Sequence, residues 1–139
     1  MNTQTIKVDE MLPIIIESLN AKQKATFMVV GSSMHPFLKH KESKVTIQKK
    51  QTYHKYDIIL FHYMSTVRLH RIVKIKGEHI TVQGDNLRSK EFITKQDIIG
   101  YVTQFENKRK TTLCDSTLYK LKVILWLIIR PIGIRLIRK

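Results

Sequence analysis

The chain carries a serine, a histidine and an aspartate, in that order, in surroundings that suit nucleophilic catalysis. Ser33 lies in a Gly-led turn after an apolar segment, His70 lies in a strand-like segment, and Asp85 directly follows another. A serine hydroxyl becomes a nucleophile when a histidine accepts its proton, and a carboxylate at the second imidazole nitrogen fixes the tautomer of that histidine. The pattern predicts acyl transfer, with Ser33 as nucleophile, His70 as general base and Asp85 as the orienting carboxylate.

Each of the three residues also has an ordinary structural explanation. Gly-Ser-Ser and Gly-Asp-Asn are common turn sequences. Alternation along the strand places His70 on the same face as Arg68 and Lys74, where a histidine is solvated. Those cations lower the pKa of the imidazole and keep it neutral, which also suits a general base. The residues considered singly favour the structural explanation, and their occurrence together favours the catalytic one.

Four sequence blocks in a fixed order resemble the type I signal peptidases, a family of serine endopeptidases. The blocks are GSSMHP (31–36), YDIILF (56–61), LHRIV (69–73), and GDN (84–86) followed by DIIGYV (97–102). Each block is weak alone, and their order over about half of the chain carries the resemblance. It implies a β-rich fold, cleavage after small residues, the serine before Met34 as nucleophile and His70 as base. Histidine at the base position is typical of the endoplasmic-reticulum and archaeal type, whereas most bacterial members and the LexA-like self-cleaving repressors have lysine.

The chain departs from the family pattern at two places that bear on the site. Gly31 stands where the family commonly has a serine whose hydroxyl helps to bind the oxyanion. The predicted oxyanion- and substrate-binding residues are therefore Ser32, Ser33 and Met34, with the Ser33 amide as a donor. Residues 88–91 (RSKE) stand where the family has its second acidic block, so no second carboxylate is assigned.

Hydrophobic periodicity predicts a mainly β fold with an N-terminal helix and a C-terminal amphipathic helix. Residues 7–20 and 116–129 have helical spacing, and Pro131 disturbs the second helix. Short, closely spaced strands between them predict a small antiparallel, partly closed β fold, which the resemblance identifies as the signal peptidase/LexA type. Residues 1–107 are predicted to form a peptidase-like domain, and residues 108–139 a basic amphipathic tail. The predicted strands, rich in Val, Ile, Thr and aromatic residues, are 26–30, 44–48, 57–63, 67–75, 79–83 and 98–105.

The net charge of +14 predicts an anionic partner. From residue 108 onward, nine Lys or Arg accompany a single acid, Asp115, so the partner surface is expected near the C-terminus. The longest apolar run there, residues 123–129, is too short to cross a bilayer. Two interpretations fit residues 116–139: an interfacial helix on an anionic membrane, with Trp126 at the boundary, and a core helix packed on the β domain. Nucleic-acid binding fits less well, because the segment lacks interleaved aromatic residues.

No cofactor, metal or disulfide is expected. Cys114 is the only cysteine, and no catalytic motif surrounds it. The histidines lack metal-ligand spacing, and the chain has no phosphate-binding glycine loop. The N-terminal region lacks the pattern of a secretion signal, and its apolar stretch, residues 11–16, is too short for the membrane anchor of orthodox signal peptidases. The expected location is the cytoplasm, with peripheral attachment at the inner face of the membrane.

Two functions from different classes are compatible with these features. The first is a serine endopeptidase that cleaves a leader or signal-like segment from a peptide or pre-protein near a membrane. The second is a non-catalytic basic adaptor that keeps a peptidase-like fold and binds anionic lipid, nucleic acid or a partner protein. The catalytic pattern and the family resemblance favour the peptidase.

Overall fold

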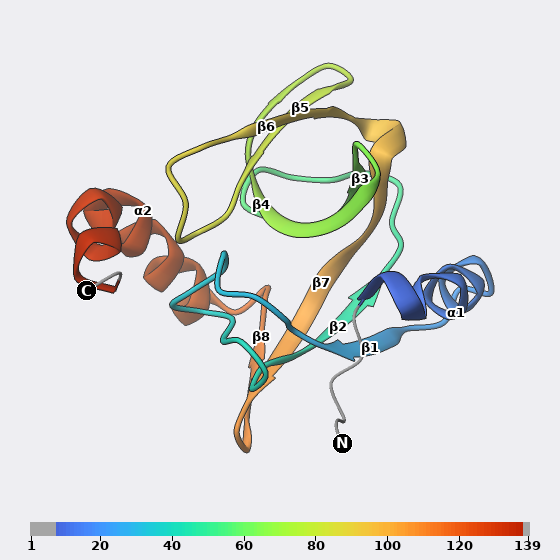
Figure 1. The fold of residues 1–139 in the computed structure, drawn as a ribbon, viewed down its shortest axis with the longest axis horizontal. Coiled ribbons are helices and arrows are strands. Elements are labelled where there is room, and N and C mark those ends of the chain that lie inside the picture. The colour runs from blue at the N-terminus through green and yellow to red at the C-terminus, as the bar shows by residue number, and fades with distance from the viewer. Residues whose placement is uncertain (1–7, 138–139) are drawn as a thin grey trace.

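A computed structural model describes residues 8–137, which form a β-sheet between two helices (Figure 1). The helices are α1 (Val8–Asn20) and α2 (Thr117–Ile137), and a single 3-10 turn, η1 (Lys95–Asp97), precedes β7. The strands are β1 (Ala25–Met28), β2 (Lys44–Gln48), β3 (Ile58–Tyr63), β4 (Thr66–Lys76), β5 (His79–Gln83), β6 (Glu91–Thr94), β7 (Ile98–Asn107) and β8 (Lys110–Leu113).

The eight strands form one antiparallel sheet in the order β1-β2-β7-β3-β4-β5-β6, with β8 added beside β7. The long β7 joins the two parts of the sheet, because it pairs with β2, β3 and β8. Figure 1 shows β3 to β6 coiled at one end of the molecule, and α1 and α2 on opposite sides. The end strands β1 and β6 do not pair with each other, so the sheet is open. The mainly β, antiparallel fold with two flanking helices is confirmed, but the sheet is not closed.

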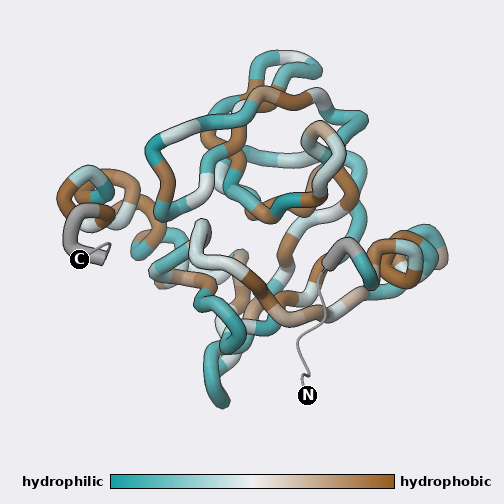
Figure 2. Tube along the Cα trace, viewed as in Figure 1, coloured by the Kyte–Doolittle hydropathy of each residue, from teal (hydrophilic) through white to brown (hydrophobic). Residues whose placement is uncertain are grey.

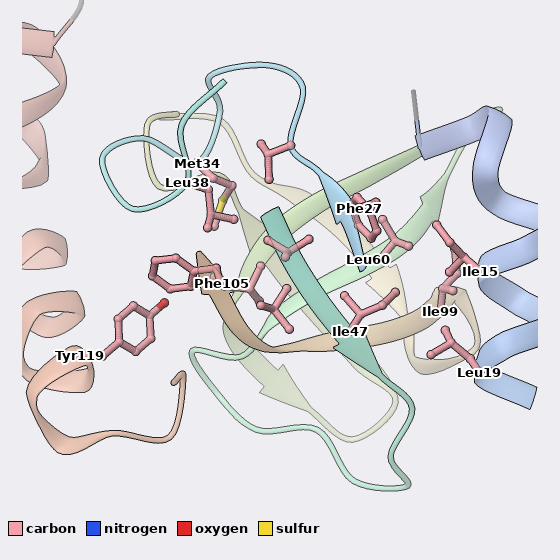
Figure 3. Packing of buried hydrophobic residues seen from close by; sticks show 14 of the residues in the cluster. Ile15, Leu19, Phe27, Met34, Leu38, Ile47, Leu60, Ile99, Phe105 and Tyr119 are labelled. Atoms are coloured by element: carbon pink, nitrogen blue, oxygen red, sulfur yellow. The ribbon is translucent and has the colours of Figure 1, made fainter. Parts of the chain in front are cut away.

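Two apolar clusters form the core. The larger one lies between the helices, where Ile15 and Leu19 of α1 and Tyr119 of α2 pack against β2 and β7 (Figure 3). The smaller one lies among β3 to β6. Strand β3 is buried on both faces, with Leu60 in the larger cluster and Phe61 in the smaller one. A strand covered on both faces shows a continuous apolar run instead of alternation.

Strand β4 is also covered on both faces where it crosses the centre of the sheet. His70 and the next residue, Arg71, point to opposite faces and are only 3% and 0% exposed. The solvated position predicted for His70 is therefore wrong, because Phe61 and the edge of β6 cover that face. A register shift between Ile72 and Lys74 then interrupts the alternation, and the end of the strand is exposed.

Helix α2 packs on the sheet through one face. Its first turn is capped by Ser116, whose hydroxyl accepts the N–H of Tyr119 at 3.2 Å. The helix continues past Pro131, where the sequence predicted a disturbance. Proline tends to break a helix, but packing stabilises this one beyond Pro131. Ile134 is buried after the proline, and Gly133 lies so close to the Trp126 ring that a Cβ there would be 2.3 Å from it. No helix within residues 8–137 has the length and apolar character needed to cross a membrane.

Two neighbouring residues of α2 test this docking. Val123 is buried in the larger cluster, whereas Ile124 is 45% exposed. We expect Val123→Ala to lower the free energy of unfolding by about 2 kcal/mol, from lost burial and the cavity left behind. Ile124→Ala, the matched control, should have a much smaller effect. Equal effects in urea denaturation would contradict the docking of α2 through the Tyr119 face.

Candidate active site

Ser33 lies in the turn that follows β1. The turn begins at Gly31, whose φ of 101° falls in the left-handed region that favours glycine. The Gly31 N–H donates to Nδ1 of His40 at 2.7 Å. Ser33 itself is half-buried, and the side chain of Met34 enters the core, where its sulfur accepts the N–H of Asp85 at 3.4 Å. The turn is thus fixed on both sides of the serine.

The Gly-Asp-Asn turn after β5 packs directly against the serine turn. The backbone N–H of Asn86 donates to the Ser33 carbonyl at 2.9 Å, and its side-chain amide donates to the Ser32 carbonyl at 3.2 Å. Gly84 allows this approach, because a Cβ there would lie only 2.7 Å from the Ser33 carbonyl oxygen. The structure therefore places two of the sequence blocks in contact.

Ser33 and His70 line the same cavity, whose volume is about 330 Å³. Within residues 8–137 no hydrogen bond joins the Ser33 hydroxyl to the His70 imidazole, as is common before a substrate binds. The rest of the lining is mostly apolar and comes from β1, β3, β4 and the two turns; it consists of Phe27, Met28, Val29, Val30, Met34, Leu60, Val67, Arg68, Leu69 and Leu87. The serine turn and strand β4 thus line one cavity that has room for a substrate side chain.

The carboxylate bonded to His70 is Glu91. Its Oε1 lies 2.7 Å from Nδ1 of His70, and its Oε2 accepts a hydrogen bond from Nη1 of Arg68 at 3.2 Å. Both His70 and Glu91 are buried, so the contact is shielded from water. Because Nδ1 is bonded to Glu91, Nε2 is the ring nitrogen that remains to accept a proton in the neutral imidazole.

Burial lowers the pKa of His70 below its ordinary value, because the charged imidazolium loses hydration. The hydrogen bond and the negative charge of Glu91 raise the pKa in opposition, and the positive charge of Arg68 lowers it. The net shift is downward, so the imidazole is neutral at neutral pH. A neutral imidazole with one oriented nitrogen has the properties of a general base.

Asp85 does not contact His70, and the predicted orienting role of Asp85 is corrected here. Its two oxygens accept hydrogen bonds from Nε and Nη2 of Arg71, both at 2.8 Å. This ion pair is fully buried. Since Arg71 and His70 point to opposite faces of β4, a carboxylate bonded to one cannot orient the other in this arrangement.

The buried ion pair also connects α2 to the serine turn. Nη2 of Arg71 donates to the Tyr119 hydroxyl at 3.0 Å, and the indole N–H of Trp126 donates to the backbone carbonyl of Asp85 at 2.8 Å. Burial opposes the charge on Arg71, but Asp85 and Tyr119 raise its pKa above the ordinary value. Burial raises the pKa of Tyr119 to about 12, so its hydroxyl stays protonated. No pattern in the sequence predicted that Tyr119 contacts Arg71 or that Trp126 contacts the backbone of Asp85.

Glu91 was absent from the predicted site because its strand was absent from the predicted sheet. It is the first residue of β6, a strand of four residues, and it pairs with Val82 of β5. The segment 88–91 has mostly polar residues and matches no family block. The one available signal was alternation from Glu91 to Thr94, with Ile93 inward, which is short for a strand prediction.

Neither a reactive cysteine nor a metal-binding cluster is found among the described residues. Burial raises the pKa of Cys114 to about 12, so its thiol is protonated at neutral pH. No cluster of three or more His, Cys, Asp and Glu side chains suited to a metal occurs in the part of the chain that the structure describes.

A scan against protein-family models finds no matching family, and a search of curated proteins finds no match.

The buried ion pair leads to a stability prediction. Arg71→Met leaves the Asp85 carboxylate buried without its partner, and we expect the free energy of unfolding to fall by about 3–5 kcal/mol. Lys74→Met, on the exposed end of the same strand, is the matched control and should change stability little. Urea denaturation followed by circular dichroism measures both. A variant Arg71→Met as stable as the control would contradict the structural role of the pair.

Proposed function

We propose that this protein is a serine endopeptidase similar to the type I signal peptidases, which removes a leader or signal-like segment from a peptide or pre-protein near a membrane. The observation that carries the proposal is that Ser33 and His70, far apart in sequence, line one cavity, while Nδ1 of His70 is bonded to buried Glu91. Both observations support the proposal, because activation of a serine by histidine requires the two residues at one site and an oriented imidazole.

The proposed reaction uses Ser33 as nucleophile. Its hydroxyl attacks the scissile carbonyl as Nε2 of His70 takes the proton, giving a tetrahedral oxyanion. His70 then protonates the leaving amine as the peptide bond breaks, and a water activated in the same way hydrolyses the acyl-enzyme. The Ser33 N–H is a candidate oxyanion donor, whereas the Gly31 N–H is already bonded to His40. The exposed hydroxyl of Ser32 is a second candidate, and Met34 shapes the cavity wall.

The position of β1 suits a peptide substrate. Among residues 8–137 it is an end strand of the sheet, and its one pairing partner there is β2. An extended peptide can pair with such an edge through its backbone. Residues of β1 and those directly after it, Phe27 to Val30, line the cavity beside Ser33. A bound peptide therefore passes the nucleophile with one side chain in an apolar cavity, in agreement with the small residues that the family resemblance implies.

The second candidate, a basic adaptor without catalysis, is supported by the net charge of +14. It differs from the peptidase in one respect that is easily measured. Its binding of polyanions or partner proteins does not depend on Ser33 or His70.

Single substitutions separate the two functions. We expect Ser33→Ala and His70→Ala each to lower cleavage of a proteome-derived peptide library by about a thousandfold or more, measured as new peptide termini by mass spectrometry. Ser89→Ala and His79→Ala, at exposed positions outside the cavity, are matched controls and should cleave normally. No cleavage by the unchanged protein, together with polyanion binding that survives both catalytic-site changes, would establish the adaptor instead.

Glu91→Gln tests the orienting role by its pH dependence. The carboxylate raises the pKa of His70 against the effect of burial, so its removal should lower that pKa further. We expect kcat to fall by at least about tenfold, and the acid limb of kcat/KM to move to lower pH, because the base stays neutral in more acidic solution. Glu78→Gln, at an exposed hairpin turn, should change neither. Loss of rate with an unmoved acid limb would mean that Glu91 acts on stability alone.

A further inference from the structure

Helix α2 has two apolar faces, and only one is covered. The residues that pack inward are Tyr119, Val123 and Trp126, at steps of four and three, and Ile134 about two turns further on; all four are buried. The opposite side follows the same spacing and is exposed; its large aliphatic residues are Leu118, Leu121, Ile124, Leu125, Ile128, Ile129 and Ile132. Figure 2 shows α2 at the edge of the molecule and largely in the hydrophobic colour. An exposed contiguous apolar face of this kind marks an interaction surface.

Cations border this outer face. Helical periodicity places Lys120 on one side of the aliphatic stripe and Lys122 on the other, and both are exposed. From residue 108 to the end of the chain, Asp115 is the only acid. An aliphatic stripe bordered by lysines matches the boundary between acyl chains and phosphates, because lysines reach the headgroups while the stripe enters the apolar layer.

A groove beside the start of α2 extends the cationic surface. Its volume is about 510 Å³, and it shares Leu118 with the aliphatic stripe. Lys39, Lys110 and Lys122 line it, and its lining, which lies wholly within the described residues, contains no Asp or Glu. The groove therefore offers several positive charges to an anionic group directly beside an exposed apolar face.

We propose that the outer face of α2 docks on an anionic lipid bilayer, with the aliphatic side chains among the acyl chains and the bordering lysines at the headgroup phosphates. Charge complementarity favours this occupant over a second copy of the chain, because a symmetric pair would bring Lys120 and Lys122 against like charges. It is also favoured over nucleic acid. The aromatic residues of α2, Tyr119 and Trp126, are buried, so none is available to stack on bases.

The test is cosedimentation of the full chain with vesicles, carried out on Ser33→Ala so that the result is independent of the proposed peptidase activity. We expect binding to vesicles of phosphatidylglycerol and phosphatidylcholine, and weak binding to phosphatidylcholine alone. The pair Leu125→Gln and Ile128→Gln should weaken binding by about tenfold or more. The pair Lys120→Glu and Lys122→Glu should do the same, since each lysine near an anionic surface contributes to binding.

Matched control pairs carry equal changes elsewhere. Lys74→Glu with Lys76→Glu reverses the same number of charges on β4, and Met64→Gln with Phe92→Gln removes exposed apolar side chains outside α2. Both control pairs should bind as strongly as the parent, and circular dichroism confirms that every variant is folded. The proposal is overturned if the parent does not bind anionic vesicles, or if control and α2 pairs weaken binding equally. It is also overturned if sedimentation equilibrium shows a dimer that the Leu125 and Ile128 changes dissociate.

Discussion

The buried ion pair between Arg71 and Asp85 is the constraint on which the rest of the arrangement depends. A buried ion pair is stable only if the remaining donors and acceptors of both side chains are hydrogen-bonded. This requirement restricts the positions of the segments that supply those partners. The guanidinium contacts a backbone carbonyl at Tyr56 and the Tyr119 hydroxyl in addition to its carboxylate. The residue after Asp85 donates to the Ser33 carbonyl. Strand β4, the Gly-Asp-Asn turn, α2 and the nucleophile turn therefore share one polar centre.

The orienting role that the sequence analysis predicted for Asp85 falls to Glu91, and Asp85 pairs with Arg71. Consecutive residues of β4 point to opposite faces of the sheet, so His70 and Arg71 meet different acids. Asp85 neutralises the arginine and fixes the turn that contacts Ser33, whereas Glu91 bonds to the imidazole. In the proposed mechanism, Asp85, which lies in a block that resembles the family, has a structural role. Glu91, which lies outside the four blocks, positions the imidazole of His70.

Much of the fold was predictable because hydrophobic periodicity is local. Strands β2 and β5 have the predicted bounds, and α1 begins and ends within one residue of its predicted range. Strands β6 and β8 were not predicted, since segments of four residues give little alternation; β6 pairs with β5, and β8 forms a tight hairpin with β7 in which Asn107 lies opposite Lys110. The contact between His70 and Glu91 depends on β6, so it was missed with the strand. The two interpretations of the C-terminal segment were not separable from sequence because both faces of α2 are apolar, and the structure shows one face packed on the core.

The central claim is that the Ser33 hydroxyl and the His70 imidazole act as one catalytic unit. The most direct test is the cleavage rate of the double variant Ser33→Ala/His70→Ala compared with the two single variants on the same peptide. Residues that act as a unit are strongly non-additive, so the double variant should retain about the same residual rate as either single variant. A double variant whose losses multiply, or single variants that cleave as fast as the unchanged protein, would contradict the claim.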